Sequence, residues 1–127
     1  MSDLEQMFVG TFYSMLIRTA VSSSSGHITV PELREQINIL PRRGNELGKV
    51  VNQTLLRIAK FEHSHNRPML TSLVCKQEKN SSKFWPSDWF FTCAKELGYD
   101  IDSMDAKQKH QFWKSHFEES HRYWTIK

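Results

Sequence analysis

Two cysteines are the side chains of this sequence best suited to nucleophilic chemistry. Cys75 and Cys93 lie far apart and form no Cys-x-x-Cys pair, so we expect neither a disulfide framework nor a redox motif. A thiol becomes nucleophilic when a base or a positive charge lowers its pKa, and neither cysteine lies in a pattern that indicates such an activating neighbour. Folding could still bring His63 or His65 to Cys75, so an enzyme with a Cys/His site stays open as a third alternative. The favoured expectation is two buried thiols and a protein that is not an enzyme.

The six histidines lack the spacing of a metal site. His110, His116 and His121 are separated by six and five residues, and His63 and His65 by two. Metal ligands on one face of a helix are about three or four residues apart. The five glycines are scattered singly, so the sequence contains no glycine loop that would cradle a phosphate. We therefore expect no metal and no cofactor.

Positive charge gathers in the middle of the chain. Residues 42–67 hold six Lys or Arg against two Glu, a local charge of +4, and extending the segment to residue 83 makes nine against three, or +6. The whole chain carries only +3. Such a segment is typical of a surface that meets phosphate or an acidic protein, although ordinary solvated helices also carry many lysines. The candidate partner-binding residues are Arg42, Arg43, Lys49, Asn52, Gln53, Arg57, Arg67, Lys76, Lys79, Lys83, Trp85 and Trp89.

An aromatic cluster follows this basic segment. Its members within eight residues are Phe84, Trp85, Trp89, Phe90 and Phe91. They cannot all point one way, so we expect Trp85 to be partly exposed, where it would stack on an unpaired base or anchor a protein interface. The alternative is that all five close the core over a neighbouring strand.

Hydrophobic spacing predicts helices around a small β element. The expected helices cover residues 2–21, 29–40, 45–61, 87–97 and 105–124, and the expected strands cover 27–29 and 69–76, with a polar loop at 77–83. Thr29 and Ser87 are the predicted helix caps, and Gly98 is expected to end the fourth helix. Phe61 keeps the helical spacing of the apolar face of the third helix.

This order of elements is that of a winged-helix domain with helices appended to its end. We expect an α+β, mostly α, single domain over residues 1–127, with the helix-turn-helix and wing region at 27–83 and a helical part at 87–124. In such a fold the helix at 45–61 can enter the major groove of DNA. Its Asn and Gln side chains would then read bases, while the preceding arginines would hold phosphates.

Composition indicates a cytoplasmic protein. The chain has 127 residues, of which 39% are hydrophobic and 24% charged, as is ordinary for one globular domain. No run approaches the roughly 20 apolar residues of a membrane span, and Asp3 and Glu5 precede the first apolar run where a signal peptide is basic. We expect no membrane association.

The runs RPMLTSLVCKQ, PSDWFFTCAKELGY and FWKSHFEESHRYW together resemble a loosely characterised family of small bacterial winged-helix-like domains. The shared pattern is P-x-L-x-x-L-V, then W-F-F, F-W and Y-W, and the resemblance covers residues 27–124. It implies a neutralising or DNA-associated role in bacterial and phage conflict systems, with no established active site. This sequence departs from the pattern where residues 83–85 and Ser87 replace the glycines of the family's loop.

Two functions from different classes stay open. The favoured one is a non-catalytic binding protein of the immunity or inhibitor type, which neutralises a protein partner such as a toxin or nuclease. The alternative is a winged-helix DNA-binding protein that uses the helix at 45–61 and the basic loop. DNA is disfavoured because Glu46 would repel phosphate at the N-terminal turns that read bases, and because the net charge is modest. Val9, Tyr13 and Ile17 form a second apolar stripe on the first helix, which also allows a homodimer through that helix.

Overall fold

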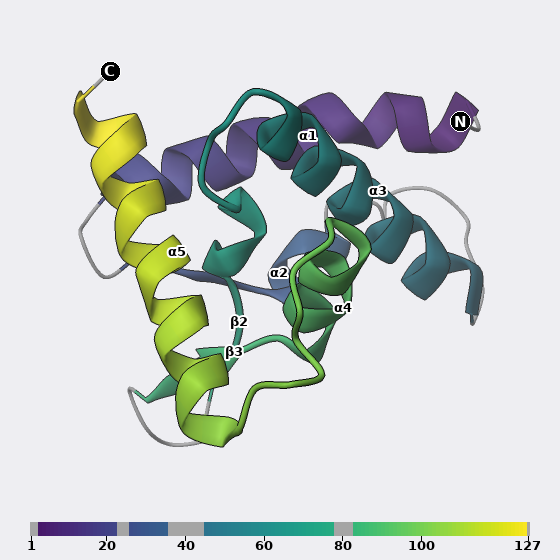
Figure 1. Cartoon of the computed structure of the whole chain (residues 1–127). Helices are drawn as coiled ribbons and strands as arrows, with labels where there is room; N and C mark the ends of the chain where they lie inside the picture. The colour runs from purple at the N-terminus through teal and green to yellow at the C-terminus, as the bar shows by residue number, and fades with distance from the viewer. Residues whose placement is uncertain (1–2, 23–25, 36–44, 78–82, 127) are drawn as a thin grey trace.

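The computed structural model of the chain is an α+β structure, mostly helical, and describes residues 3–22, 26–35, 45–77 and 83–126 (Figure 1). Its elements in chain order are α1 (Asp3–Ser22), β1 (Ile28–Thr29), α2 (Val30–Glu35), α3 (Asn45–Ser64), the 3₁₀ turn η1 (Leu70–Leu73), β2 (Val74–Gln77), β3 (Phe84–Pro86), α4 (Asp88–Glu96) and α5 (Ala106–Ile126). The expected helices at 2–21, 45–61, 87–97 and 105–124 correspond to α1, α3, α4 and α5. The predicted second helix is described as far as Glu35.

The short turn η1 is the centre of the core. It lies among α1, α3 and α5, and all four of its residues are buried (Figure 1). Hydrogen bonds to helix α5 help to hold it: the Trp113 indole donates to the Ser72 carbonyl at 2.9 Å, and the Ser120 hydroxyl donates at 3.2 Å to the carbonyl of Met69, the residue before η1. The three long helices are therefore packed around a segment that has no exposed face.

The prediction of a strand over 69–76 was wrong in its first half. Residues 70–73 form η1, and the strand begins only at Val74. A short continuous apolar run does not distinguish a buried strand from a buried helical turn. A helical turn allows four consecutive side chains to be buried between the long helices, whereas a strand would alternate its faces.

The small sheet has the order β1-β2-β3. Strands β1 and β2 are parallel, with Ile28 opposite Val74, and the chain crosses between them through α2 and α3. Strands β2 and β3 are antiparallel, with Lys76 opposite Trp85. The sequence analysis missed β3, which has only three residues and is held by its pairing with β2.

Local capping signals behave as predicted. Thr29 and Glu32 form a capping box, in which the Thr29 N–H donates to Glu32 Oε1 at 3.0 Å and the Glu32 N–H donates to Thr29 Oγ1 at 3.3 Å. The Ser87 hydroxyl accepts from the Trp89 N–H at 3.2 Å and starts α4. Gly98, with φ of 103°, ends that helix in a left-handed conformation that suits glycine.

No described helix combines the length and the apolar character that crossing a bilayer requires.

Candidate functional site

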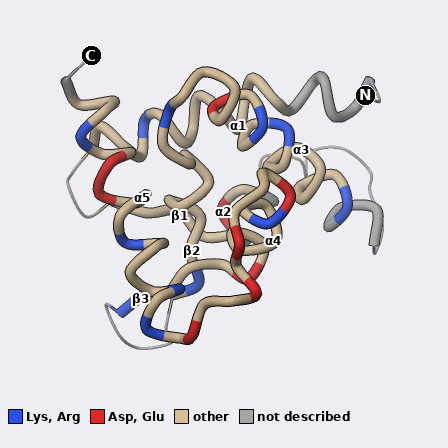
Figure 2. Tube along the Cα trace, viewed as in Figure 1, with Lys and Arg blue, Asp and Glu red and all other residues tan. Residues whose placement is uncertain are grey.

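Helix α3 presents a basic stripe to solvent. We define the basic stripe as Lys49, Gln53, Arg57 and Lys60, all exposed and spaced by four, four and three residues. Such spacing places side chains on one face of a helix. The opposite face is buried in the core through Val51, Leu55, Ile58 and other residues. Figure 2 shows the Lys and Arg positions along α3.

The cations at the C-terminal end of this stripe have no acidic partner among the described residues. The ion pairs among the described residues are formed by other cations, namely Arg67, Lys76, Lys95 and Arg122. Within the described structure, Arg57 and Lys60 are therefore available to a partner's negative charge. A surface with unpaired cations attracts acidic molecules and raises their rate of association.

An apolar groove runs between α1 and α3 beside these cations. Its volume is about 560 Å³, and its lining residues are Val9, Tyr13, Arg57, Ile58, Lys60 and Phe61. Phe61 is 47% exposed, although the sequence predicted it on the buried face of α3. The hydrophobic periodicity of α3 predicts which face is apolar, but it does not show that α1 leaves the Phe61 ring uncovered. The second apolar stripe on α1, which includes Val9 and Tyr13, was the sequence signal for this groove.

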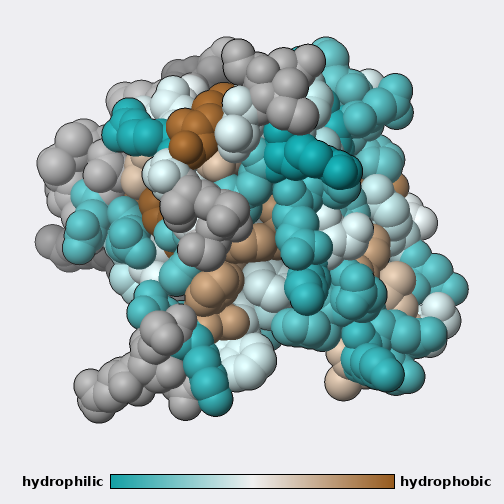
Figure 3. Space-filling model, turned by 90° about the vertical axis from the view of Figure 1, so that its left-hand side faces the viewer, coloured by the Kyte–Doolittle hydropathy of each residue, from teal (hydrophilic) through white to brown (hydrophobic). Residues whose placement is uncertain are grey.

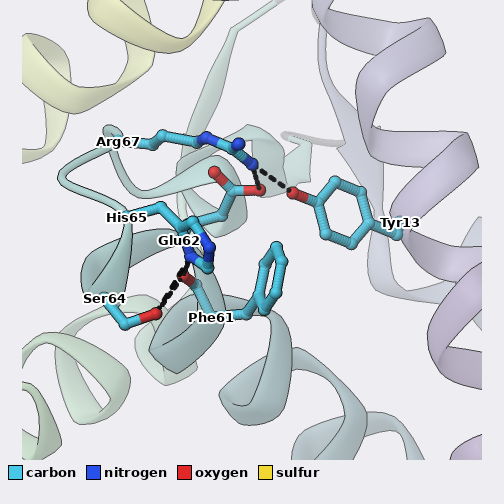
Figure 4. Close-up of polar contacts among 6 residues, drawn as sticks. All are labelled: Tyr13, Phe61, Glu62, Ser64, His65 and Arg67. Atoms are coloured by element: carbon cyan, nitrogen blue, oxygen red, sulfur yellow. Dashed lines mark hydrogen bonds and ion pairs between the residues drawn. The ribbon is translucent and has the colours of Figure 1, made fainter.

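The aromatic wall of the groove is held by contacts on its inner side. The Tyr13 and Phe61 rings meet edge to face, with their centroids 5.9 Å apart. The Phe61 ring also lies against the His65 ring at 4.4 Å, and His65 Nδ1 lies 2.9 Å from the Phe61 carbonyl oxygen (Figure 4). These contacts fix Phe61 before any partner arrives.

The partly buried Arg67 supports this wall on the side away from the groove lining. Its guanidinium donates to the Tyr13 hydroxyl at 3.2 Å and lies 3.6 Å from Glu62 Oε1 (Figure 4). The guanidinium carbon also lies between 5.7 and 5.9 Å from the centroids of three rings, those of Phe61, Tyr123 and Trp124. Arg67 was predicted from the sequence as a partner contact, which stays a prediction; its internal contacts also give it a role in positioning the groove.

Glu62 is a buried carboxylate beside this arginine. Its side chain is fully buried, and neither carboxylate oxygen has a hydrogen-bond partner within the described structure. The ion pair with Arg67 is longer than a hydrogen bond. Burial raises the pKa of Glu62, and the charges of Arg67 and His65 offset part of that rise.

The β2–β3 hairpin carries the second group of predicted contacts. Trp85 is 48% exposed, as expected, and Lys76 and Lys83 are exposed near it. Lys76 is paired with Asp88 at 3.1 Å. The hairpin lies away from α3, so the structure does not join Trp85 to the basic stripe (Figure 1).

Other predicted contacts have different positions. Trp89 is partly buried, and its indole N–H donates to the Asn52 carbonyl at 3.1 Å, which ties α4 to α3. Asn52 is itself only partly exposed. The predicted phosphate contacts Arg42 and Arg43 and the loop residue Lys79 lie outside the described residues.

The exposed side of α5 is mainly hydrophilic. Figure 3 views the molecule from the side of α5, where hydrophilic residues predominate and hydrophobic ones emerge only as small patches. Exposed lysines on this helix, such as Lys107 and Lys114, therefore lie on an ordinary solvated surface.

The two thiols are buried and protonated at neutral pH. Burial raises the pKa of Cys75 and that of Cys93 to about 12. Cys75 Sγ donates weakly to the Ser72 carbonyl at 3.5 Å. In the described part of the chain no histidine hydrogen-bonds to either thiol. A thiol at this pKa is a poor nucleophile, so the structure provides no support for the Cys/His enzyme.

The histidines have structural contacts. His116 accepts a hydrogen bond from the Met69 N–H at 3.0 Å through Nδ1, and burial lowers its pKa. The ring nitrogens of His121 lie 2.7 Å from the Ala20 carbonyl oxygen and 2.9 Å from that of Gly26. Across the described ranges, no three His, Cys, Asp or Glu side chains are grouped as a metal site would require.

No protein-family model matches this chain, and searches of curated proteins and of solved structures found no match either. The resemblance inferred from the sequence therefore stays a prediction.

Proposed function

We propose that this protein is a non-catalytic binding protein that recognises an acidic protein partner through α3 and the groove beside it. The observation that carries the proposal is the apolar groove with two exposed cations, Arg57 and Lys60, in its lining, neither of which is paired with a described carboxylate. Neutralisation of a toxin or nuclease, the role that the sequence resemblance implies, is one use of such a surface.

The composition of the groove is that of a protein interface. Tyr, Phe and Arg are enriched where partners bury side chains, and residues that are rigid before binding lose little entropy in the complex. Tyr13 and Phe61 meet both conditions, because they are aromatic and are already held by Arg67 and His65. Cations beside the apolar area would add specificity and a faster association rate.

DNA binding is the second candidate function, and the linear basic stripe on α3 favours it. A helix preceded by a short strand and a helix, and followed by a hairpin, is also the element order of a winged helix. A phosphate backbone would bind the cations of the stripe but would leave the apolar groove unused. Steep salt dependence of binding to random duplex DNA, lost in Lys49→Ser with Arg57→Ser, would make this candidate the better one.

Site-specific photo-crosslinking in the cells that make the protein tests the proposal. A photoreactive phenylalanine would replace Gln53 in the basic stripe and, as a matched control, Lys114 on the exposed face of α5. We expect a nuclease-resistant protein adduct at position 53 that disappears when Arg57→Glu and Lys60→Glu are added. A nuclease-sensitive adduct would favour DNA, and no adduct at 53, or equal adducts at both positions, would contradict both functions.

A further inference from the structure

We propose that the α1–α3 groove binds an acidic amphipathic helix of the partner, with apolar side chains against Val9, Tyr13 and Phe61 and carboxylates against Arg57 and Lys60. This inference rests on the proposed function and names the part of the partner that the groove accepts.

The bound segment of the partner must satisfy the hydrogen-bonding groups of its own backbone. The groove lies between two α-helices, whose main-chain N–H and C=O groups are bonded within each helix. It therefore offers no free backbone edge to which an extended strand could add. A helix brings its own backbone hydrogen bonds and presents side chains alone, which is what a groove lined by side chains can accept.

The size of the groove fits several side chains. At about 560 Å³ it lies inside the range of roughly 300–1,000 Å³ that holds a substantial ligand. One face of an amphipathic helix supplies apolar side chains at i, i+3 or i+4, and i+7. The uncovered ring of Phe61 gives these side chains an aromatic surface to cover.

The charge of the helix follows from the groove lining. Arg57 and Lys60 both belong to α3, so carboxylates would lie on the side of the bound helix that faces α3. In the described structure neither cation has a carboxylate to displace first. A basic or neutral helix would bury the same apolar area but would leave these two charges repelled or unpaired.

A second copy of this chain fits the groove less well. In a two-fold symmetric dimer the same patch lies on both sides of the interface. Arg57 and Lys60 of one copy would then approach the same cations of the other copy, and like charges at an interface are destabilising. The charge of the groove therefore favours an acidic partner over self-association.

The test uses a fluorescein-labelled peptide probe of 18 residues, designed from Leu and Glu with the leucines on one helical face. Three control peptides accompany it: a scrambled sequence of the same composition, a version with Lys in place of Glu, and a version with a central proline that breaks the helix. Fluorescence anisotropy measures binding. We expect the acidic amphipathic peptide to bind at least about tenfold more tightly than each control, a difference of about 1.4 kcal/mol.

Matched protein variants locate the binding. Phe61→Ser should weaken it at least about tenfold, whereas Trp85→Ser, which removes an equally exposed aromatic ring, should leave it unchanged. Arg57→Glu with Lys60→Glu should abolish it, whereas Lys107→Glu with Lys114→Glu makes the same charge change on α5 and should weaken it little. Circular dichroism verifies that each variant is folded.

Each other outcome overturns the inference. If the charge reversals on α3 and on α5 weaken binding equally, the peptide is attracted by the overall charge of the protein and does not bind in the groove. If the acidic peptide binds no better than its scrambled or proline version, or does not bind, no amphipathic helix is accepted. A dimer in sedimentation analysis that Phe61→Ser dissociates would identify a second copy as the occupant. A charge-dependent adduct at position 53 with a protein other than a second copy would leave the proposed function standing, because crosslinking does not depend on a helical ligand.

Discussion

Arg67 contacts Glu62 twice, once through a backbone hydrogen bond and once through an ion pair of the two side chains. Its backbone N–H donates to the Glu62 carbonyl at 3.0 Å, and its guanidinium lies 3.6 Å from the Glu62 carboxylate. The backbone hydrogen bond belongs to the turn that ends α3. This turn brings the Arg67 guanidinium back to the buried Glu62 carboxylate. The same guanidinium then reaches Tyr13 in α1.

Removing the arginine should therefore destabilise the protein. Arg67→Met leaves the Glu62 carboxylate buried without a counter-charge, and we expect a loss of about 3 kcal/mol of unfolding free energy at neutral pH. Urea denaturation measures this loss. The double variant Arg67→Met with Glu62→Met should recover most of it, because no buried charge remains; equal losses in the single and double variants would show that the ion pair is not the cause.

Glu62 should make the protein less stable at neutral pH than at acid pH. Burial raises its pKa in the folded state above the value in the unfolded chain, so the folded state binds the proton more tightly. The stabilisation from this group is therefore fully present below the ordinary carboxyl pKa and is lost as pH rises through the raised folded pKa. Glu62→Gln should remove this dependence. We expect the difference in unfolding free energy between this variant and the wild type to grow as pH rises, and a constant difference would contradict the assignment.

His116 should make the protein less stable at acid pH, the opposite of the effect of Glu62. Burial lowers its pKa in the folded state, and its Nδ1 must be unprotonated to accept from the Met69 N–H. The stabilisation it provides is present above the ordinary histidine pKa and is lost as pH falls through the lowered folded pKa. His116→Asn keeps an acceptor but does not titrate. Its melting temperature, compared with that of the wild type over the same pH range, should fall less on acidification.

Asn66 ends α3 in a left-handed conformation, with φ of 58°. Its N–H donates to the His63 carbonyl at 3.0 Å, one residue before the Arg67 bond that completes the turn. Asn66→Gly should change stability little, because glycine adopts this φ without strain. Asn66→Val should cost about 1–2 kcal/mol, because a β-branched residue is strained there. Thermal unfolding compares the two, and equal effects would contradict a backbone cause.

The two thiols should react only in the unfolded protein. Burial and a pKa of about 12 leave almost no thiolate at neutral pH for either Cys75 or Cys93. A colorimetric thiol reagent should label neither cysteine within minutes in buffer and both in denaturant. Rapid labelling of one cysteine in the folded protein would contradict this prediction and favour the Cys/His alternative.

Some features of the fold depend on partners close in sequence, and these were predictable. The capping box of Thr29 and Glu32 and the Ser87 cap join residues two or three positions apart. The buried face of α3 follows from helical spacing through Leu55 and Ile58. In each case the chain itself brings the interacting groups together, so residue type and spacing are sufficient.

The candidate site was less predictable, because it depends on how separate elements meet. Three members of the basic stripe, Lys49, Gln53 and Arg57, were named from the sequence. The place of Lys60 in the groove lining, the exposure of Phe61 and the contact of Arg67 with Tyr13 were not. These follow from the crossing of α1 over α3 and from the approach of Tyr13. A similar reason explains η1, where the burial of all four residues depends on three helices that surround it.

The sequence by itself therefore determined a mostly helical α+β protein with a basic middle segment, buried thiols and the helix-capping residues Thr29, Ser87 and Gly98. Each of these properties follows from residue type, short-range hydrogen bonds or hydrophobic period. Only the tertiary structure decided that α1 and α3 leave an apolar groove between them, and that Arg67 supports it from behind while Arg57 and Lys60 face outward. Helix faces that are equally apolar or equally charged in the sequence become buried or exposed according to long-range packing. The faces that stay exposed form the proposed binding surface.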